Sequence, residues 1–258
     1  MKEILAVARR AALAAGDLLR SRWECHEAPR GEAKAPYDLV SEADRASEEI
    51  IRSIIHRAFP DHAILGEEDG LQGSGDTQWI VDPLDGTANF LHRYPWWSVS
   101  IGVRAGDREL AAVVHNPLTG DLFTAIKGHG TMMNDRQVRV STPSPLSMGF
   151  IATGFPFRHR EKLDRYLSIF HSVFLQSREL RRTGSAALDL ALVASGVFHG
   201  FFEFSLSPWD IAAGTLLVRE AGGIVTDFEG GPDFMESGDI VAASPDIHQL
   251  LLRIINEI

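Results

Sequence analysis

The strongest constraint on the fold is a change in hydrophobic periodicity along the chain. Between Ala63 and Val140 the apolar residues come in short runs, which are separated by turn-forming pieces such as AGDRE and NPLTGD. The runs are AILG, QWIVD, WSVSIGV, LAAVVH and LFTAI. Short apolar runs with turns between them are typical of strands that follow one another in a sheet. We therefore predict a predominantly antiparallel sheet over this region.

Helical spacing of apolar residues precedes the sheet region. In the first segment apolar side chains recur every three or four residues, at Leu5, Ala8, Ala12, Ala15 and Leu19. This spacing predicts an amphipathic helix. Ser41, with Asp44 three residues later, has the character of a capping box, which predicts a second helix that ends before Pro60. Asp44 then lies in the first turn of that helix.

After Pro145 the chain alternates between strand-like and helical segments. The strand-like segments are GFIAT, VFHGFFEF, GIVTDF and DIVAAS, and the helical ones include EKLDRYLSIFHSVF, SAALDLALVAS and WDIAAGTLLVREAG. This alternation is typical of layered α and β structure. We therefore predict a mixed α and β fold, with an N-terminal α+β subdomain over residues 1–144 and a C-terminal α/β subdomain over residues 145–258.

Length and composition exclude several classes of protein. The chain has 258 residues, of which 45% are hydrophobic, and this fits a globular protein with a large core. No apolar run approaches the roughly 20 residues of a membrane span, and charged residues interrupt the first segment, where a signal peptide would lie. We therefore expect no membrane association and a cytoplasmic location.

Cysteine, histidine and net charge bear on metals and partners. Cys25 is the only cysteine, and the histidines show no zinc-ligand spacing, so we expect neither an internal disulfide nor a structural zinc site. The formal net charge of -10 repels polyanions at long range, which weighs against a nucleic-acid-binding surface. A negatively charged enzyme that binds phosphates needs cations to do so.

Two carboxylates follow a short buried-strand pattern in the first half of the chain. The pattern covers Trp79–Val81, so Asp82 emerges at its end, and Pro83 biases Asp82 toward an extended backbone. The segment Asp85–Thr87 then offers a turn and a helix start, where free backbone N–H groups and the helix dipole can cradle a phosphate. Asp82 and Asp85 can therefore converge on one side of this turn.

Further carboxylates stand at the expected ends of other elements. Glu67 and Glu68 follow AILG, and Asp210 begins a helix after Pro208. Functional sites are commonly built at such ends. Taken singly, an Asp-Pro-x-Asp-Gly turn, a Glu-Glu pair and an acid after a proline are usually solvated surface features. Their combination in one chain favours a functional interpretation.

Five motifs stand out along the chain, namely DLVSEAD (Asp38–Asp44), GEE (Gly66–Glu68), WIVDPLDGTANF (Trp79–Phe90), TGSAALDL (Thr183–Leu190) and WDIAAGTLLVREAGG (Trp209–Gly223). Together they resemble the inositol monophosphatase family of magnesium-dependent, lithium-sensitive phosphatases. They occur in the family's order and spacing, and the resemblance extends over the whole chain. TGFPF followed by RRTGSAALDL resembles the bacterial branch in particular. The resemblance implies a layered αβαβα sandwich of two intimately packed subdomains, and a homodimer.

The resemblance implies a centre of two or three magnesium ions per site. Glu67, Asp82 and the backbone carbonyl of Leu84 would hold the first ion. Asp82, Asp85 and Asp210 would hold the second, so that Asp82 bridges the two. Hard oxygen ligands of this kind suit Mg²⁺.

The resemblance also implies the groups that act on the attacking water and the phosphate. Thr87, together with Asp44, would orient the water and help to deprotonate it. The backbone N–H groups of Gly86 and Thr87 would contact the phosphate. With Glu67, Asp44 and Thr87 form the catalytic set that we expect.

The substrate contacts implied by the resemblance come from both halves of the chain. Glu203 matches an acid that contacts substrate hydroxyls, although a surface acid at the end of a strand is the ordinary alternative. Ser185 also fits a helix N-cap. Arg182 could attract a substrate phosphate, but coating the surface is the commoner role of an arginine. The expected substrate contacts are Asp85, Gly86, Thr87, Gly184, Ser185, Ala186, Glu203 and Asp210.

The resemblance implies a small phosphorylated polyol as substrate, and Glu203 with the Gly-Ser-Ala loop favours myo-inositol monophosphate. Related branches act on fructose 1,6-bisphosphate, 3'-phosphoadenosine 5'-phosphate or histidinol phosphate, and one or two pocket contacts can reset such a preference. A role of another class also stays open, namely a regulatory protein that binds transcription machinery, as some bacterial members do. The intact ligand set argues against regulation as the only role.

Overall fold

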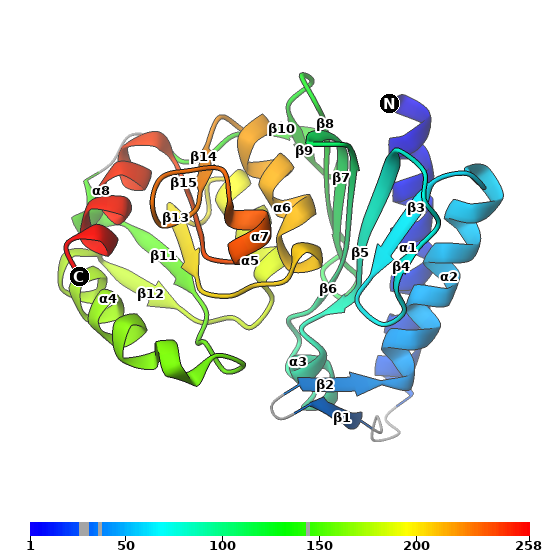
Figure 1. Cartoon of the computed structure of the whole chain (residues 1–258), viewed down its shortest axis with the longest axis horizontal. Helices are drawn as coiled ribbons and strands as arrows, with labels where there is room; N and C mark the ends of the chain where they lie inside the picture. The colour runs from blue at the N-terminus through cyan, green and yellow to red at the C-terminus, as the bar shows by residue number, and fades with distance from the viewer. Residues whose placement is uncertain (26–30, 36–37, 143–144) are drawn as a thin grey trace.

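The computed structural model of this chain describes residues 1–25, 31–35, 38–142 and 145–258. Its helices and sheets alternate in five layers (Figure 1). From right to left in the figure, these are a pair of helices, an eight-stranded sheet, a central pair of helices, a five-stranded sheet and a last pair of helices. The αβαβα sandwich of mixed α and β structure is therefore confirmed.

The first helix, α1 (Lys2–Glu24), packs against α2 (Glu42–Ala58) and against the first sheet. One face of α1 is buried, as its apolar spacing predicts. The buried residues of this face are Val7, Ala8, Ala11, Ala12, Ala15, Gly16 and Leu19.

The second helix, α2, begins with the predicted capping box. Ser41 is its N-cap and accepts a hydrogen bond from the backbone of the first turn, while the Asp44 side chain accepts one from the Ser41 N–H. Each bond satisfies an N–H group that the first turn of a helix leaves without an intrahelical partner. The helix ends at Ala58, before Pro60, as expected.

The first sheet is predominantly antiparallel, as predicted. Among the described strands of this sheet, β3 and β5 are the only neighbouring pair that runs parallel. They do so because β4 folds back along the outer edge of β3, and the chain then returns on the other side of β3. The order across the sheet is β10 (Arg136–Val138), β9 (Thr131–Met133), β8 (Asp121–Ile126), β7 (Arg108–Asn116), β6 (Ser98–Ala105), β5 (Thr77–Asp85), β3 (Ala63–Gly66) and β4 (Gly70–Gln72).

Three small elements lie beside this sheet, and the apolar pattern marks none of them, although the turn at Asp85–Thr87 predicts a helix start there. β1 (Gly31–Ala35) and β2 (Asp38–Ser41) form an antiparallel pair of their own. The short helix α3 (Thr87–Leu91) follows β5 directly and contacts β2.

The second half contains the strands and helices predicted after Pro145, together with the unexpected three-residue strand β12. β11 runs parallel to β12 and β13, and β15 runs antiparallel to β13 and β14. The sheet order is β12 (Glu179–Arg181), β11 (Phe150–Thr153), β13 (Gly200–Glu203), β15 (Ile240–Ala243) and β14 (Ile224–Thr226). The helices are α4 (Leu163–Gln176), α5 (Ala186–Ala194), α6 (Pro208–Glu220), α7 (Phe234–Ser237) and α8 (Pro245–Asn256), with 3₁₀ turns at Leu146–Met148 and Arg160–Lys162.

The helices α5 and α6 lie between the two sheets (Figure 1). Eight of the nine residues of α5 are buried. A helix that is apolar on nearly every side is suited to such a position, because both of its faces are covered. The start of α5 and the start of α6 thus meet the first sheet at the centre of the molecule.

The boundary predicted between residues 144 and 145 adjoins residues 143–144, which lie outside the described ranges. The division into residues 1–144 and 145–258 therefore stays a prediction. Among the described residues, no helix is both long and apolar enough to cross a membrane.

Candidate metal centre

An irregularity in β5 brings two aspartates together. Asp82 pairs with Ser100 of β6 and Asp85 pairs with Ser98, so β5 contains one residue more than its partner over this stretch. In a regular strand the side chains of residues three apart point to opposite faces of the sheet. The extra residue shifts this alternation, so that Asp82 and Asp85 point to the same face. Pro83 fits the irregular position, since it needs no hydrogen-bond acceptor. The Leu84 N–H then donates to Asp82 Oδ1 over 3.0 Å.

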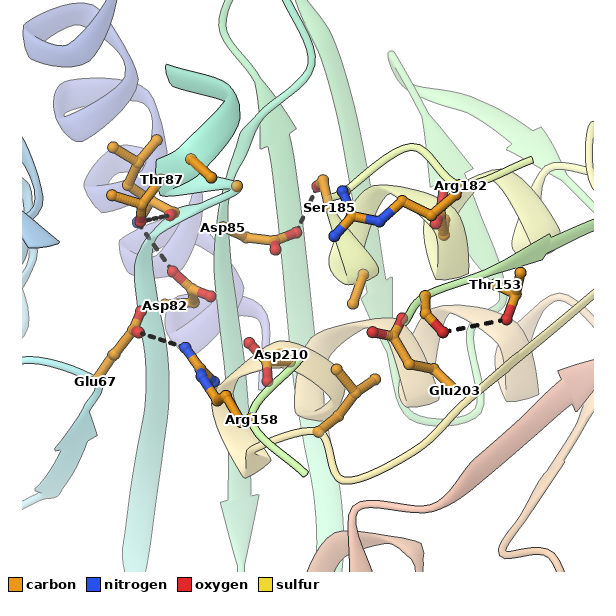
Figure 2. Close-up of a pocket in the computed structure, with 18 residues that line it drawn as sticks. Glu67, Asp82, Asp85, Thr87, Thr153, Arg158, Arg182, Ser185, Glu203 and Asp210 are labelled. Atoms are coloured by element: carbon orange, nitrogen blue, oxygen red, sulfur yellow. Dashed lines mark hydrogen bonds and ion pairs between the residues drawn. The ribbon is translucent and has the colours of Figure 1, made fainter. Parts of the chain in front are cut away.

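A third carboxylate arrives from α6. Asp210 lies in the first turn of α6, where its Oδ2 accepts a 2.7 Å hydrogen bond from the Ser207 N–H in a capping box. One carboxylate oxygen from each of Asp82, Asp85 and Asp210 lies within 4.8 Å of the others. Figure 2 shows the three side chains converging on one space.

This carboxylate cluster is electrostatically suited to a cation. Asp82 is 2% exposed, and burial raises its pKa well above the usual range, with further rises caused by the charges of Glu67, Asp85 and Asp210. Burial also raises the pKa of Asp85, against hydrogen bonds that lower it. Carboxylates this close repel one another, and a divalent cation with oxygen ligands relieves the repulsion. The donor set therefore fits Mg²⁺.

One oxygen of Asp85 is held by the second half of the chain. Asp85 Oδ2 accepts hydrogen bonds from the Ala187 N–H over 2.9 Å and from the Ser185 hydroxyl. Ser185 is the N-cap of α5, as predicted, and accepts from the Leu188 N–H. The Ser185 hydroxyl therefore points at a carboxylate of the candidate metal centre. The sequence predicts a helix N-cap and a polyol contact for Ser185, but not this bond to Asp85.

Asp44 and Thr87 form the pair that the resemblance implies. The Thr87 hydroxyl lies 2.8 Å from Asp44 Oδ1 and 3.1 Å from the Leu84 carbonyl oxygen. Asp44 is fully buried, and burial raises its pKa, while hydrogen bonds from Ser41 and Thr87 act in the opposite direction. A raised pKa makes this carboxylate a better proton acceptor.

Glu67 lies on the turn after β3 and lines the same cavity. Its Oε1 is 3.9 Å from Nη2 of Arg158, which reaches across from the second half (Figure 2). Among the described residues, Glu67 is not one of the three acids whose carboxylate oxygens lie within 4.8 Å of one another. Its charge nevertheless raises the pKa of Asp82 more than any other nearby charge does.

The cavity holds about 190 Å³ and gathers almost every residue expected at the site. Asp44 is the exception, because it lies behind Thr87. Gly86 has a φ of 96°, and a Cβ atom added to it would lie 3.2 Å from the Gly184 carbonyl oxygen. The expected residues that line the cavity are Glu67, Asp82, Leu84, Asp85, Gly86, Thr87, Gly184, Ser185, Ala186, Glu203 and Asp210.

Glu203 lies in the cavity opposite the metal-site carboxylates (Figure 2). Burial raises its pKa well above the usual range, and the charges of Asp189 and Asp210 add to the rise. Arg182 lines the cavity too and lowers the pKa of Glu203, so its side chain does more than coat the surface. Its guanidinium also lies over the Phe157 ring, 5.3 Å from the centroid.

Sequence reasoning missed three residues with polar or charged side chains that line the cavity, namely Thr153, Arg158 and Asp189. Asp189 is 1% exposed and accepts a 2.7 Å hydrogen bond from the Thr183 hydroxyl. Its position four residues after Ser185 places it on the same face of α5, and this spacing could have revealed it. Arg158 lies in a segment without periodicity, so no local signal marks it.

Comparisons with known proteins agree with this geometry. The sequence model of the inositol monophosphatase family matches residues 1–258. The chain is 46% identical over 254 residues to the Nus factor SuhB of Escherichia coli, which covers 98% of this chain and 95% of that protein.

Two solved structures share the whole fold. The extragenic suppressor protein suhB from Bartonella henselae superposes with a TM-score of 0.95 at 41% identity, covering 99% of each chain. The inositol monophosphatase from Anabaena (Nostoc) has a TM-score of 0.89 at 38% identity, and covers 100% of this chain and 96% of that one.

Proposed function

Because the chain belongs to the inositol monophosphatase family, we propose that it is a magnesium-dependent phosphomonoesterase that hydrolyses myo-inositol monophosphate to inositol and phosphate. The observation that supports this most strongly is the position of Thr87. Its hydroxyl bonds to buried Asp44 and lines the same cavity as the cluster of Asp82, Asp85 and Asp210. The proposed metal ligands thus share one small cavity with a hydroxyl group that is bonded to a proton acceptor behind it.

The proposed metal ligands are those that the motifs imply. Glu67, Asp82 and the Leu84 carbonyl would hold one ion, and Asp82, Asp85 and Asp210 the other. Bound Mg²⁺ lowers the pKa of a coordinated water and offsets the negative charge of the phosphate. The carboxylates themselves keep the cavity polar and position the cations where a phosphate monoester would otherwise be repelled.

Thr87 and Asp44 handle the proton of the attacking water. The Thr87 hydroxyl donates to Asp44, so its oxygen can accept a hydrogen bond from a water molecule in the cavity. The water is thereby oriented, and its proton can pass through the Thr87 hydroxyl to Asp44 Oδ1. The backbone N–H groups of Gly86 and Thr87 would contact the phosphate.

The opposite wall of the cavity suits a hydroxyl-rich leaving group. Glu203 and Asp189 present carboxyl oxygens there, and the Gly184–Ala186 segment adds backbone groups close to Asp85. A cavity of about 190 Å³ with polar walls suits a small polyol. We propose Glu203 and Gly184–Ala186 as the polyol contacts.

Phosphate release from a panel of substrates tests the proposal. We expect the highest kcat/KM for myo-inositol monophosphate, ahead of fructose 1,6-bisphosphate, histidinol phosphate and 3'-phosphoadenosine 5'-phosphate. Activity should vanish with EDTA, return with Mg²⁺ and fall with Li⁺. Full activity in EDTA would refute the metal mechanism, whereas preference for another substrate would leave the chemistry and change only the specificity.

A cytoplasmic location, expected from the sequence pattern, and a homodimer, which the resemblance implies, belong to the same proposal. Light scattering on the purified chain measures its mass in solution directly. A monomeric mass at micromolar concentration would contradict the proposed homodimer.

A second candidate is a regulatory role with transcription machinery. The support is that the relative from Escherichia coli, at 46% identity, is named a Nus factor. Replacing Asp85 with Asn separates the two roles. Lost hydrolysis with retained binding to transcription proteins would support two functions, and an inactive parent enzyme that binds them would favour regulation.

A further inference from the structure

One face of α2 buries polar side chains where a helix against a sheet normally buries apolar ones. Asp44, Ser47 and Glu48 are at most 1% exposed. Their spacing of three and four residues places them on one side of the helix. Asp44 bonds to Thr87, and the Ser47 hydroxyl donates to the Pro83 carbonyl oxygen over 2.7 Å. Two of these side chains thus bind the end of β5 and the start of α3, next to the proposed metal ligands Asp82 and Asp85.

The third side chain, Glu48, binds the turn that carries Glu67. Its Oε2 accepts a 2.9 Å hydrogen bond from the Glu68 N–H, and its Oε1 accepts a 3.1 Å bond from the Asp69 N–H. A buried carboxylate is costly unless it is hydrogen-bonded, and bonds to an ionised acceptor are stronger than neutral ones. The turn immediately after Glu67 is therefore tied to α2.

Gly66 completes the fit on the other side of Glu67. A Cβ atom on Gly66 would lie 2.4 Å from Glu48 Oε1 and 2.6 Å from Oε2. The carboxylate thus fills the space into which a side chain at residue 66 would project. The Glu67 N–H also donates to the Val81 carbonyl oxygen over 3.2 Å. Glu67 is therefore fixed on both sides, by a close contact before it and by hydrogen bonds after it.

We propose that Glu48 is a positioning residue, which holds the Glu67 turn toward the cavity and so sets the affinity of the site for its first metal ion. The proposal rests on the metal centre proposed above. Glu48 does not line the cavity among the described residues, so it acts through the backbone of Glu68 and Asp69. Loss of a group that orients a metal ligand typically lowers metal affinity about 10- to 100-fold.

Glu48→Gln tests the proposal, because the amide nitrogen cannot accept a backbone N–H. Calorimetric titration with Mg²⁺ should show a dissociation constant raised about tenfold, and the Mg²⁺ concentration for half-maximal activity should rise in parallel. At saturating Mg²⁺, kcat should return to within about twofold of the parent value. Unchanged Mg²⁺ affinity in a folded variant would overturn the proposal, as would a lower kcat with unchanged affinity.

Gly66→Ala disturbs the same contact from the other side and should give the same result. Glu48→Asp keeps the charge but withdraws it by one methylene group, so it should weaken Mg²⁺ binding as well. Any one of the three variants that folds by circular dichroism is enough to decide the question. Wild-type Mg²⁺ affinity in it would contradict the proposal.

A matched control is Glu220→Gln. Glu220 is also shielded from solvent and accepts a 3.0 Å bond from a backbone N–H, that of Gly130, but it does not line the cavity. The Mg²⁺ affinity of the Glu220→Gln variant should equal that of the parent protein. Asp82→Asn serves as the reference for the metal centre itself, because it removes a proposed ligand. If Asp82→Asn bound Mg²⁺ normally, the metal centre would be wrong, whatever the result for Glu48.

Discussion

Asp85 Oδ2 accepts a 2.9 Å hydrogen bond from the backbone N–H of Ala187, a residue 102 positions further along the chain. Asp85 belongs to β5 and Ala187 to the start of α5. The hydrogen bond therefore links the first sheet, at the candidate metal centre, to a helix that lies between the two sheets. Free N–H groups at the start of a helix stabilise a carboxylate through hydrogen bonds and the helix dipole. Stability and metal binding are therefore coupled at this point.

Ser185→Ala should lower the free energy of unfolding by about 1 kcal/mol, the usual cost of losing a helix N-cap. The Ser185 hydroxyl accepts from the Leu188 N–H and donates to Asp85, so both contacts disappear together. Urea denaturation without metal measures the loss. Ser195→Ala at the other end of α5 is the control, and its free energy of unfolding should stay within about 0.5 kcal/mol of the parent. Equal losses in the two variants would contradict the prediction.

Thr87→Ala should lower kcat about a hundredfold or more, because the attacking water loses its link to Asp44. KM and the Mg²⁺ dissociation constant should change little, since no proposed ligand side chain is removed. Steady-state kinetics at saturating Mg²⁺ measures the split. Thr87→Ser keeps the hydroxyl and should retain most of the activity. A Ser variant as inactive as the Ala variant would show that the hydroxyl is not the important group.

The stabilisation of the protein by Mg²⁺ should grow with pH. Burial raises the folded-state pKa of Asp82 and Asp85, so their contribution to stability is fully present below the unfolded pKa and is lost as the pH rises through the folded pKa. Mg²⁺ binds the ionised carboxylates and offsets this loss. The rise in Tm on adding Mg²⁺ should therefore be larger at about pH 8 than at about pH 5. Asp82→Asn should reduce the difference, and an equal rise at both values would refute the prediction.

His248 should make the protein less stable in mild acid. Burial lowers the pKa of this histidine to about 4, and its Nε2 lies 2.9 Å from the Thr226 hydroxyl. Because the folded pKa is depressed, the contribution of His248 is present above the unfolded pKa of about 6.5 and is lost as the pH falls toward 4. The loss amounts to at most about 3 kcal/mol.

Denaturant unfolding of His248→Gln at several pH values tests this. The free energy of unfolding should depend less on pH over the window between about 6.5 and about 4 than it does in the parent. His171→Gln, at an exposed position of α4, should keep the parent's slope. An unchanged slope in the His248 variant would show that another group causes the acid sensitivity.

Local signals predicted the framework well because they act within a few residues. The capping box at Ser41 and Asp44 located the start of α2, and the short apolar runs located β3, β5, β6, β7 and β8 of the first sheet, although not its three-residue strands β4, β9 and β10. Motifs of this kind also located most of the cavity. They could not show that β3 and β5 run parallel, since that depends on which edge of β3 the strand β4 occupies.

The missed residues depend on contacts between segments far apart in the sequence. From the sequence alone Arg182 is expected to coat the surface, as most arginines do, and only the fold brings it beside Glu203 and Asp189. Arg158 meets Glu67 across the cavity, 91 positions away. In the sequence Glu48 looks like an ordinary helix residue, and only the fold shows that it accepts hydrogen bonds from the turn after β3. No periodicity marks such partners.

Gly86 lies close to the backbone of two other segments, since an added Cβ would come within 3.1 Å of the Trp96 carbonyl oxygen and 3.2 Å of the Gly184 carbonyl oxygen. A methyl group at residue 86 would force the backbone of Trp96, or that of Gly184 just before α5, to give way by a few tenths of an ångström. The missing side chain at Gly86 thus lets the end of β5 stay close to the start of α5, where the phosphate is expected to bind.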